Sequence, residues 1–170
     1  FDKASSPGGV PANVIPRFRI KRAELEADIE RIRALGVEMR FGVETRSLEN
    51  LEAEGFKAFF VGAGAPVPRK LEIQGEAFPV VDALTFLAAG NAASGGAFGK
   101  PRRVVVAGGG NTAMDAVRLA LRLPGIEEVR LSYRRGKTEM PADKEELDNA
   151  LGGGGKLMEL SLPERSFVGP

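Results

Sequence analysis

Residues 103–123 carry the pattern that most restricts how this chain can fold. An apolar run is followed by three consecutive glycines and then by apolar residues at helical spacing. Gly108, Gly110 and Ala113 fit the motif G-x-G-x-x-A. Gly108 permits a tight turn, and Ala113 allows a helix to pack closely on the preceding strand. The pattern predicts a buried strand over 103–107 that turns at once into a helix.

The residues after this turn continue the alternation of helices and strands. We predict a helix over 111–123, a strand over 129–133, a second helix over 143–151 and a third strand over 156–160. The order βαβαβ is the repeating unit of a doubly wound parallel sheet. The second half of the chain is therefore predicted to be an α/β, Rossmann-like unit.

The first half shows shorter and more interrupted patterns. Its Pro and Gly residues predict a loop over 1–16, and apolar spacing predicts helices over 22–35 and 47–55. Alternating polarity predicts a strand with one buried face over 37–41. The apolar run 56–61 is typical of a strand covered on both faces. This half is also predicted to be α/β.

A segment rich in Gly, Ala, Ser and Asn separates the two halves. After a short helical segment at 82–88, residues 90–99 have the composition of a flexible linker. We therefore place a domain boundary there, with one domain over 1–98 and the other over 99–170. Because the chain begins at Phe1 without an initiator Met, we expect it to be a segment of a longer protein.

The composition excludes several kinds of chemistry. The 170 residues include 24 Lys and Arg against 23 Asp and Glu, which leaves no net field for nucleic acid or a membrane surface. The chain has no Cys and no His, which excludes disulfides, thiolate metal sites and imidazole catalysis. We identify no candidate catalytic residue and no metal ligand. No apolar run is long enough to span a membrane and no signal-peptide pattern is found, so we expect a soluble, cytoplasmic protein.

The glycine turn is a candidate site for the pyrophosphate of a dinucleotide. Free N–H groups at a helix start can face an anion, and Gly110 lets the anion approach the backbone. Tight strand-to-helix turns also favour glycine without any ligand. Asn111 has two interpretations, as a helix cap or as a ligand, and Asp115 is assigned a structural role. The candidate residues are Gly108, Gly109, Gly110, Asn111, Thr112 and Ala113.

The end of the second predicted strand indicates which nucleotide the site prefers. A site for NADH places Asp or Glu there to bind the ribose 2′-hydroxyl, whereas this strand runs into Arg134 and Arg135. Two guanidinium groups suit the 2′-phosphate of NADPH, and each charge-assisted hydrogen bond contributes about 1.5–3 kcal/mol. A solvated basic loop is the alternative interpretation. The position directly after the strand favours NADPH.

Three short motifs in the second half resemble one family of oxidoreductases. They are GGGNTAMD at 108–115, YRR at 133–135 and EMPA at 139–142. Together they resemble the small (beta) subunit of NADPH-dependent glutamate synthase. They are also similar to the amino-terminal region of dihydropyrimidine dehydrogenase and to selenate reductase subunits, within the pyridine nucleotide-disulfide oxidoreductase superfamily. Segments of the first half that fall where this family has FAD-domain motifs are 1–3, 7–9, 15–16, 18–19 and 60–65.

The resemblance implies a FAD domain interrupted by an inserted NADPH domain. Electrons would pass from NADPH to the flavin and on to iron–sulfur centres in a partner domain or subunit. Residues 1–98 would be a truncated FAD-binding-type domain, and residues 99–170 a partial NADPH-binding Rossmann domain. The residues that the resemblance assigns to FAD are Asp2, Gly8, Gly9 and Gly64.

Several parts of the family pattern have no counterpart in this sequence. They are the first strand with its G-x-G-x-x-G for FAD, the cysteine-rich amino-terminal domain and the carboxy-terminal FAD segment. Asp2 stands where the family has Glu. We therefore expect this chain to bind FAD weakly or not at all and to be inactive alone, within a parent enzyme that is an NADPH-dependent flavin oxidoreductase. The alternative is a non-catalytic nucleotide-binding or assembly module, and the edges of a truncated sheet are expected to allow pairing between copies.

Overall fold

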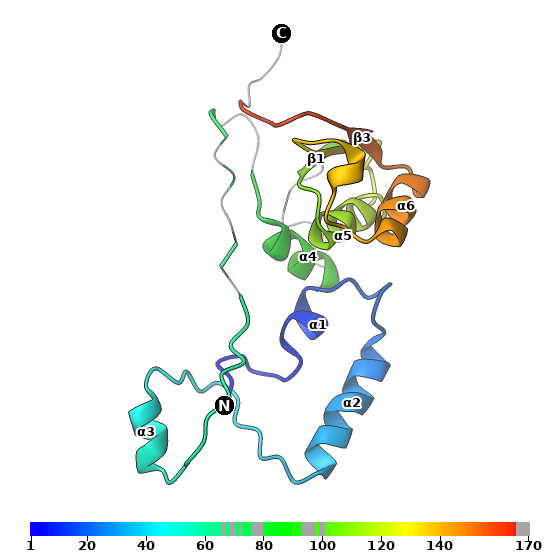
Figure 1. Cartoon of the computed structure of the whole chain (residues 1–170). Helices are drawn as coiled ribbons and strands as arrows, with labels where there is room; N and C mark the ends of the chain where they lie inside the picture. Colours follow the sequence, from blue (N-terminus) through cyan, green and yellow to red (C-terminus); the bar gives the residue numbers. More distant parts are fainter. Residues whose placement is uncertain are drawn as a thin grey trace. The chain divides into compact units, whose positions relative to one another are not determined.

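The computed structural model describes residues 1–65, 67–68, 71, 73–75, 80–92, 98 and 101–165. The chain forms two units, and each is described by itself (Figure 1). The first comprises Phe1–Asn13 and Arg17–Val67, and the second comprises Val14–Pro16 and the chain from Pro68 onward. The domain boundary between residues 98 and 99 stays a prediction. Most of the predicted linker, 90–99, lies outside the described residues, and its first two residues belong to a helix.

A three-stranded parallel sheet forms the centre of the second unit. Its strands, in their order across the sheet, are β1 (Arg103–Ala107), β2 (Glu128–Ser132) and β3 (Lys156–Met158). The register places Val106, Leu131 and Leu157 in one row, so one face of the sheet is apolar. Parallel neighbours require crossover connections, and a helix supplies each of them here. The predicted α/β, Rossmann-like βαβαβ unit is confirmed.

Three helices pack together on the apolar face of this sheet. They are α4 (Ala83–Asn91), α5 (Asn111–Ala120) and α6 (Lys144–Gly152). α5 occupies the centre, because it contacts β1, β2, α4 and α6 (Figure 1). Met114 and Val117 of α5 are fully buried, and Leu87 of α4 is 1% exposed. Burial of each such side chain contributes about 1.5–3 kcal/mol, so the core of this unit depends most on α5.

The other face of the sheet is open in the described part of the chain. Val105, at the centre of β1, is 57% exposed, so the prediction that the whole valine run is buried is wrong. Charged side chains occupy the same face, where Glu128 pairs with Lys156 at 2.9 Å and with Arg130 at 3.2 Å. Hydrogen bonds from these two cations lower the pKa of the Glu128 carboxyl below its ordinary value. β1 therefore alternates between covered and exposed side chains.

Three helices supply the regular structure of the first unit. They are α1 (Gly9–Asn13), α2 (Arg22–Ala34) and α3 (Leu48–Ala53). α2 and α3 confirm the helices predicted there, whereas α1 lies within the predicted loop 1–16. Ser47 caps α3, because its hydroxyl accepts a hydrogen bond from the N–H of Glu49 at 3.2 Å. This contact satisfies one of the free N–H groups at the start of the helix.

The two strands predicted in the first unit are not formed. Residues 37–41 form one isolated bridge with the start of the chain, between Asp2 and Phe41, in which the N–H of Asp2 donates to the carbonyl of Arg40 at 2.9 Å. Residues 56–61 lie in no strand of the described structure. An apolar or alternating run becomes a strand only when a neighbouring strand satisfies its backbone groups. The described residues of this unit supply no such neighbour.

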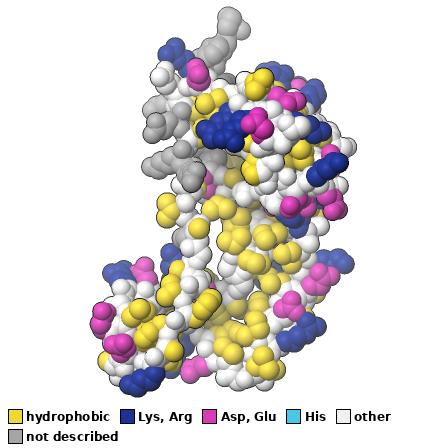
Figure 2. All heavy atoms as spheres, in the orientation of Figure 1, with side chains coloured by type: hydrophobic (Ala, Val, Ile, Leu, Met, Phe, Trp, Pro, Cys, Tyr) yellow, Lys and Arg dark blue, Asp and Glu magenta, His cyan; other side chains and the backbone are white. Residues whose placement is uncertain are grey.

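The first unit also buries few of its apolar side chains. None of the residues of α1, α2 and α3 is buried, and Phe60 and Val61 are 97% and 73% exposed. Figure 2 shows hydrophobic side chains at the surface in the region where Figure 1 draws α2 and α3. Phe1 packs edge-to-face on Phe56 with ring centroids 5.6 Å apart, and Arg40 lies 5.1 Å from the centroid of Phe1. Local contacts of this kind therefore hold this unit together.

Candidate dinucleotide-binding site

The first glycine of the turn has a backbone conformation that favours glycine. Gly108 has a φ of 148°, and its N–H donates to the carbonyl of Ser132 at 3.0 Å. A Cβ at this position would lie 3.3 Å from the Cβ of Ala113, which is closer than an ordinary van der Waals contact. Larger side chains at either position would push α5 away from β1. The close packing of α5 on β1 therefore explains why both residues are small, whether or not a ligand binds.

The third glycine of the turn leaves open space at the start of α5. Gly110 is the N-cap residue, and its carbonyl accepts from the N–H of Ala113 at 2.9 Å and of Met114 at 3.2 Å. A Cβ at Gly110 would meet no atom within 4 Å. The N–H groups of Asn111 and Thr112 precede the first intrahelical hydrogen bond, so they can bind an anion. Packing does not require glycine at position 110, whereas close approach of a phosphate would.

The second glycine of the turn lies against the ring of Tyr133. Gly109 is buried, and a Cβ there would lie 2.4 Å from Cε2 of Tyr133. The hydroxyl of Tyr133 donates to the carbonyl of Glu139 at 2.9 Å, and the N–H of Ala142 donates to the carbonyl of Gly109 at 3.0 Å. These contacts join the glycine turn to the loop after β2. Tyr133 was identified in the sequence only as part of the YRR motif, and its contacts with the glycine turn and with Glu139 were not predicted.

Asn111 joins the starts of two helices. Its Nδ2 donates to Oδ2 of Asp143 at 2.8 Å, and its Oδ1 accepts from the N–H of Asp143 at 2.9 Å. Asp143 is the N-cap residue of α6, so this reciprocal pair holds the first residue of α5 beside the start of α6. Neither of the two sequence interpretations of Asn111, a cap of its own helix or a ligand, included this contact.

Arg134 and Arg135 lie directly after β2. Because β1 and β2 are parallel neighbours, the loops that follow them leave the sheet at the same edge. Both arginines are exposed, and neither side chain forms a hydrogen bond or ion pair with a described residue. Their backbone is fixed, since the carbonyl of Arg135 accepts from the N–H of Leu160 at 3.2 Å. The structure thus presents two cations on an anchored loop.

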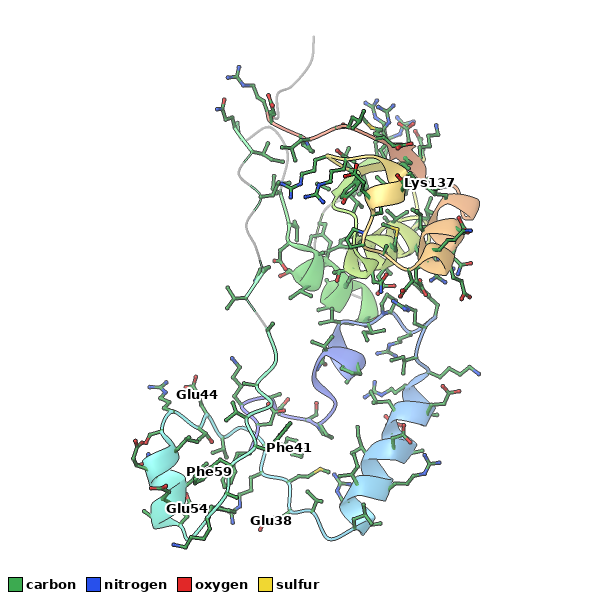
Figure 3. The ribbon with its side chains drawn as sticks, viewed as in Figure 1. Glu38, Phe41, Glu44, Glu54, Phe59 and Lys137 are labelled. Atoms are coloured by element: carbon green, nitrogen blue, oxygen red, sulfur yellow. The ribbon has the colours of Figure 1, made fainter. Side chains whose placement is uncertain are left out.

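A third cation, Lys137, lies in the same loop and was not identified from the sequence. It begins the short 3-10 helix η2 (Lys137–Glu139) and is labelled in Figure 3. Its backbone N–H donates to Oε2 of Glu159 at 2.6 Å, and the N–H of Gly136 donates to Oε2 of Glu139 at 3.1 Å. Carboxylates thus hold the backbone of the loop, while the ammonium of Lys137 has no ion-pair partner in the described part of the chain.

The residues expected at FAD belong to the first unit, and the candidate dinucleotide site belongs to the second. The N–H of Ala4 donates to Oδ1 of Asp2 at 2.9 Å. Gly8, Gly9 and Gly64 have φ values of 107°, 48° and 72°, which favour glycine. A Cβ at Gly8 would also lie 2.7 Å from that of Ala12 in α1. These glycines are explained by local turns, and their assignment to FAD stays a prediction.

The glycine turn lines neither of the two best-defined cavities among the described residues. One of about 480 Å³ is lined by residues 73–74 and 162–165, and one of about 260 Å³ lies in the first unit beside Phe1 and Ser47. The candidate site combines the backbone groups of a partly buried glycine turn with exposed cations. The described residues contain no group of three or more His, Cys, Asp or Glu that could hold a metal ion. No described helix is both long and apolar enough to cross a membrane.

Known proteins are similar to this chain along most of its length, although no family model matches it. The chain is 37% identical, over 97% of its length, to YgfK of Escherichia coli strain K12, which is named an oxidoreductase. It is 39% identical, over 95% of its length, to the NADPH-Fe(3+) oxidoreductase subunit beta of Geobacter sulfurreducens. It is 32% identical, over 88% of its length, to the glutamate synthase (NADPH) small chain of Escherichia coli strain K12.

The chain spans only part of each of these relatives. It covers 16% of YgfK, 24% of the Geobacter subunit and 34% of the glutamate synthase small chain. The similarity extends over both units, because the aligned segments cover nearly all of the chain. The chain is thus homologous to one segment of the oxidoreductases that include the glutamate synthase small chain, which confirms the resemblance identified from its motifs.

Proposed function

We propose that the second unit binds NADPH at the edge of the sheet where β1 and β2 end. The pyrophosphate would bind the N–H groups at the start of α5, next to Gly110. The 2′-phosphate would bind Arg134 and Arg135. The observation that carries the proposal is the open space at Gly110, where no atom would meet a Cβ within 4 Å. It lies at the same end of the sheet as two arginines whose side chains have no partner among the described residues.

Charge supports NADPH over NADH at this site. The loop presents Arg134, Arg135 and Lys137, and a hydroxyl gains little from such cations, whereas a phosphate accepts charge-assisted hydrogen bonds. Each such bond contributes about 1.5–3 kcal/mol, so two arginines suffice for a preference of about a hundredfold or more. The names of two relatives, an NADPH-Fe(3+) oxidoreductase and an NADPH-dependent glutamate synthase, agree with this preference.

In the longer protein we propose transfer of hydride from NADPH to FAD. Bound NADPH supplies the hydride, and this chain contributes by holding and orienting the nucleotide, since it has no Cys or His for other redox or acid–base work. Asp2, Gly8, Gly9 and Gly64 would lie toward the FAD, as the family resemblance implies. This chain alone would bind FAD weakly and would be inactive, because the glycine turn that anchors the FAD pyrophosphate in the family has no counterpart in its sequence.

The electrons would pass from the flavin to an iron–sulfur domain or subunit. Two relatives are named beta subunits of larger oxidoreductases, which supports a partner of this kind. We also propose that the protein works in the cytoplasm. Copies of this chain would pair through the free edges of β1 and β3, the outer strands of the described sheet. Analytical ultracentrifugation of the chain tests that pairing, and a monomer at all concentrations would exclude it.

Calorimetric titration with NADPH and with NADH tests the nucleotide assignment. The unsubstituted chain should bind NADPH at least tenfold more tightly, and the double variant Arg134→Gln/Arg135→Gln should lose that preference. Arg102→Gln is the matched control. Arg102 precedes β1, at the end of the sheet opposite to the candidate site, and pairs with Glu127. Equal affinity for the two nucleotides would contradict the assignment of the arginines. Binding of neither would favour the alternative of an assembly module that retains the glycine turn for folding.

Absorbance tests the flavin part of the proposal. The purified chain should be colourless after gel filtration, with no absorbance band near the visible wavelengths at which FAD absorbs. A longer protein that includes the missing FAD-domain segments should be yellow and should be reduced by NADPH. Retention of FAD by this chain through gel filtration would show that the absent glycine turn is not the main anchor.

A further inference from the structure

Tyr133 connects the two parts of the proposed site. Its ring packs on Gly109 of the glycine turn, and its hydroxyl donates to the carbonyl of Glu139 at 2.9 Å, on the far side of the arginine loop. Tyr133 is only 9% exposed, so ring and hydroxyl are largely shielded from water. Arg134 and Arg135 follow directly in the chain. One side chain therefore contacts the proposed pyrophosphate site and closes the loop that carries both cations.

We propose that Tyr133 is a positioning residue that sets the preference of this site for a 2′-phosphorylated nucleotide. It acts by fixing Arg134 and Arg135 relative to the glycine turn. This inference rests on the function proposed above and adds a residue outside the phosphate-binding groups. Its basis is the juxtaposition of the Tyr133 ring with Gly109 and of the Tyr133 hydroxyl with Glu139.

Both backbone polar groups of Tyr133 form hydrogen bonds, which fix the position from which its side chain extends. Its N–H donates to the carbonyl of Met158 at 3.0 Å, and its carbonyl accepts from the N–H of Ser161 at 2.9 Å. The hydroxyl bond to Glu139 then closes a loop over a separation of six residues. A loop whose backbone is already ordered loses less conformational freedom when its side chains bind a ligand. An anchored loop therefore favours binding of the 2′-phosphate, because this group must contact both guanidinium groups at once.

The ring of Tyr133 also explains a glycine that the nucleotide motif does not require. The middle position of G-x-G accepts any residue in the motif, yet here it is Gly109. A Cβ at Gly109 would lie 2.4, 2.7 and 2.9 Å from three carbons of the Tyr133 ring. The backbone of Gly109 does not have a positive φ, so its conformation alone does not demand glycine. Position 109 is glycine because the ring occupies the space of its side chain.

The substitution Tyr133→Phe separates the hydroxyl from the ring. Phenylalanine keeps the ring on Gly109 and removes only the hydrogen bond to Glu139. We expect the affinity for NADPH to fall by as much as about tenfold, because the cost of ordering the released loop on binding is limited by the free energy of this one neutral hydrogen bond. The affinity for NADH should change less than twofold, because NADH has no 2′-phosphate for the arginines. Calorimetric titration with both nucleotides measures the two affinities.

Thr138→Val is the matched control for this experiment. It removes a hydroxyl from the same loop, and the Thr138 hydroxyl makes no hydrogen bond with a described residue. The control should keep the full preference for NADPH. An equal loss of both nucleotides in Tyr133→Phe, or no loss of either, would overturn the positioning role. Failure of the unsubstituted chain to prefer NADPH would overturn the proposed function itself, and the positioning role with it.

Discussion

Alanine at position 109 would place a methyl group where the ring of Tyr133 lies. The added Cβ would be 2.4 Å from Cε2 of the ring, well inside the 3.4–4 Å of ordinary contact. The ring cannot move outward at no cost, because its hydroxyl donates to Glu139 and its backbone is bonded on both sides. The Gly109→Ala chain must therefore displace the ring or separate the turn from the loop.

The magnitude follows from two contributions. Overpacking of a filled site costs about 1–3 kcal/mol. Loss of the Tyr133 hydrogen bond to Glu139 costs about 1 kcal/mol more. The free energy of unfolding should therefore fall by about 2–4 kcal/mol. This is a large part of the 5–15 kcal/mol that is typical of a whole domain.

Urea unfolding followed by tyrosine fluorescence measures this change directly. The chain has one Tyr and no Trp, so the signal reports on Tyr133 alone. Gly110→Ala is the control: its added Cβ meets nothing within 4 Å, so stability should fall by less than about 1 kcal/mol. NADPH binding should nevertheless be lost in this control, because the methyl group fills the proposed phosphate space.

A double-mutant cycle read by circular dichroism completes the test. In the Tyr133→Ala background the cost of Gly109→Ala should fall below about 0.5 kcal/mol, since the colliding ring is gone. If the cost is the same with and without the ring, the collision is not what makes position 109 glycine, and the reasoning is refuted.

Three further predictions concern other parts of the chain. Asp82 caps α4 by accepting from Thr85, and these hydrogen bonds lower the pKa of its carboxyl. Asp82→Ala should therefore cost about 1 kcal/mol at neutral pH, and the difference should vanish in urea titrations as the pH falls through that lowered pKa. Glu146→Gln should cost about 2–3 kcal/mol by thermal unfolding, because Glu146 pairs with largely buried Arg118 at 2.6 Å; an unchanged midpoint would count against this. Limited proteolysis should cut residues 1–67 before the second unit, because α1, α2 and α3 bury no residue, and the opposite order would contradict that.

The second unit was predictable because its local patterns agree with one another. A valine run, a glycine turn and a helix with small residues at the contact all indicate the same βα unit. The structure begins β2 at Glu128 and ends it at Ser132, one residue earlier than predicted, and α5 ends at Ala120 instead of Leu123. Helix and strand ends depend on capping and pairing that apolar periodicity does not encode.

The first unit shows what sequence patterns cannot supply. The runs 37–41 and 56–61 have strand-like composition, but a strand exists only with a partner, and periodicity does not identify one. α1 was missed because a helix of five residues has no periodicity to detect.

The candidate site was predicted in part. The motif identified the glycines and the position after β2 identified the arginines, because both follow from spacing along the chain. The contacts of Tyr133 with Glu139 and of Asn111 with Asp143 depend on how two loops meet in space. The signal available for Tyr133 was that the chain's single tyrosine directly precedes two arginines.

The reciprocal pair of Asn111 and Asp143 has a consequence for engineering. Position 111 needs a side chain that both donates and accepts at one short reach, which aspartate, serine or leucine does not offer in the same geometry. Thr112, its exposed neighbour in the first turn of α5, makes no side-chain hydrogen bond with a described residue. A library intended to retune nucleotide choice should therefore randomise position 112 and hold position 111 constant.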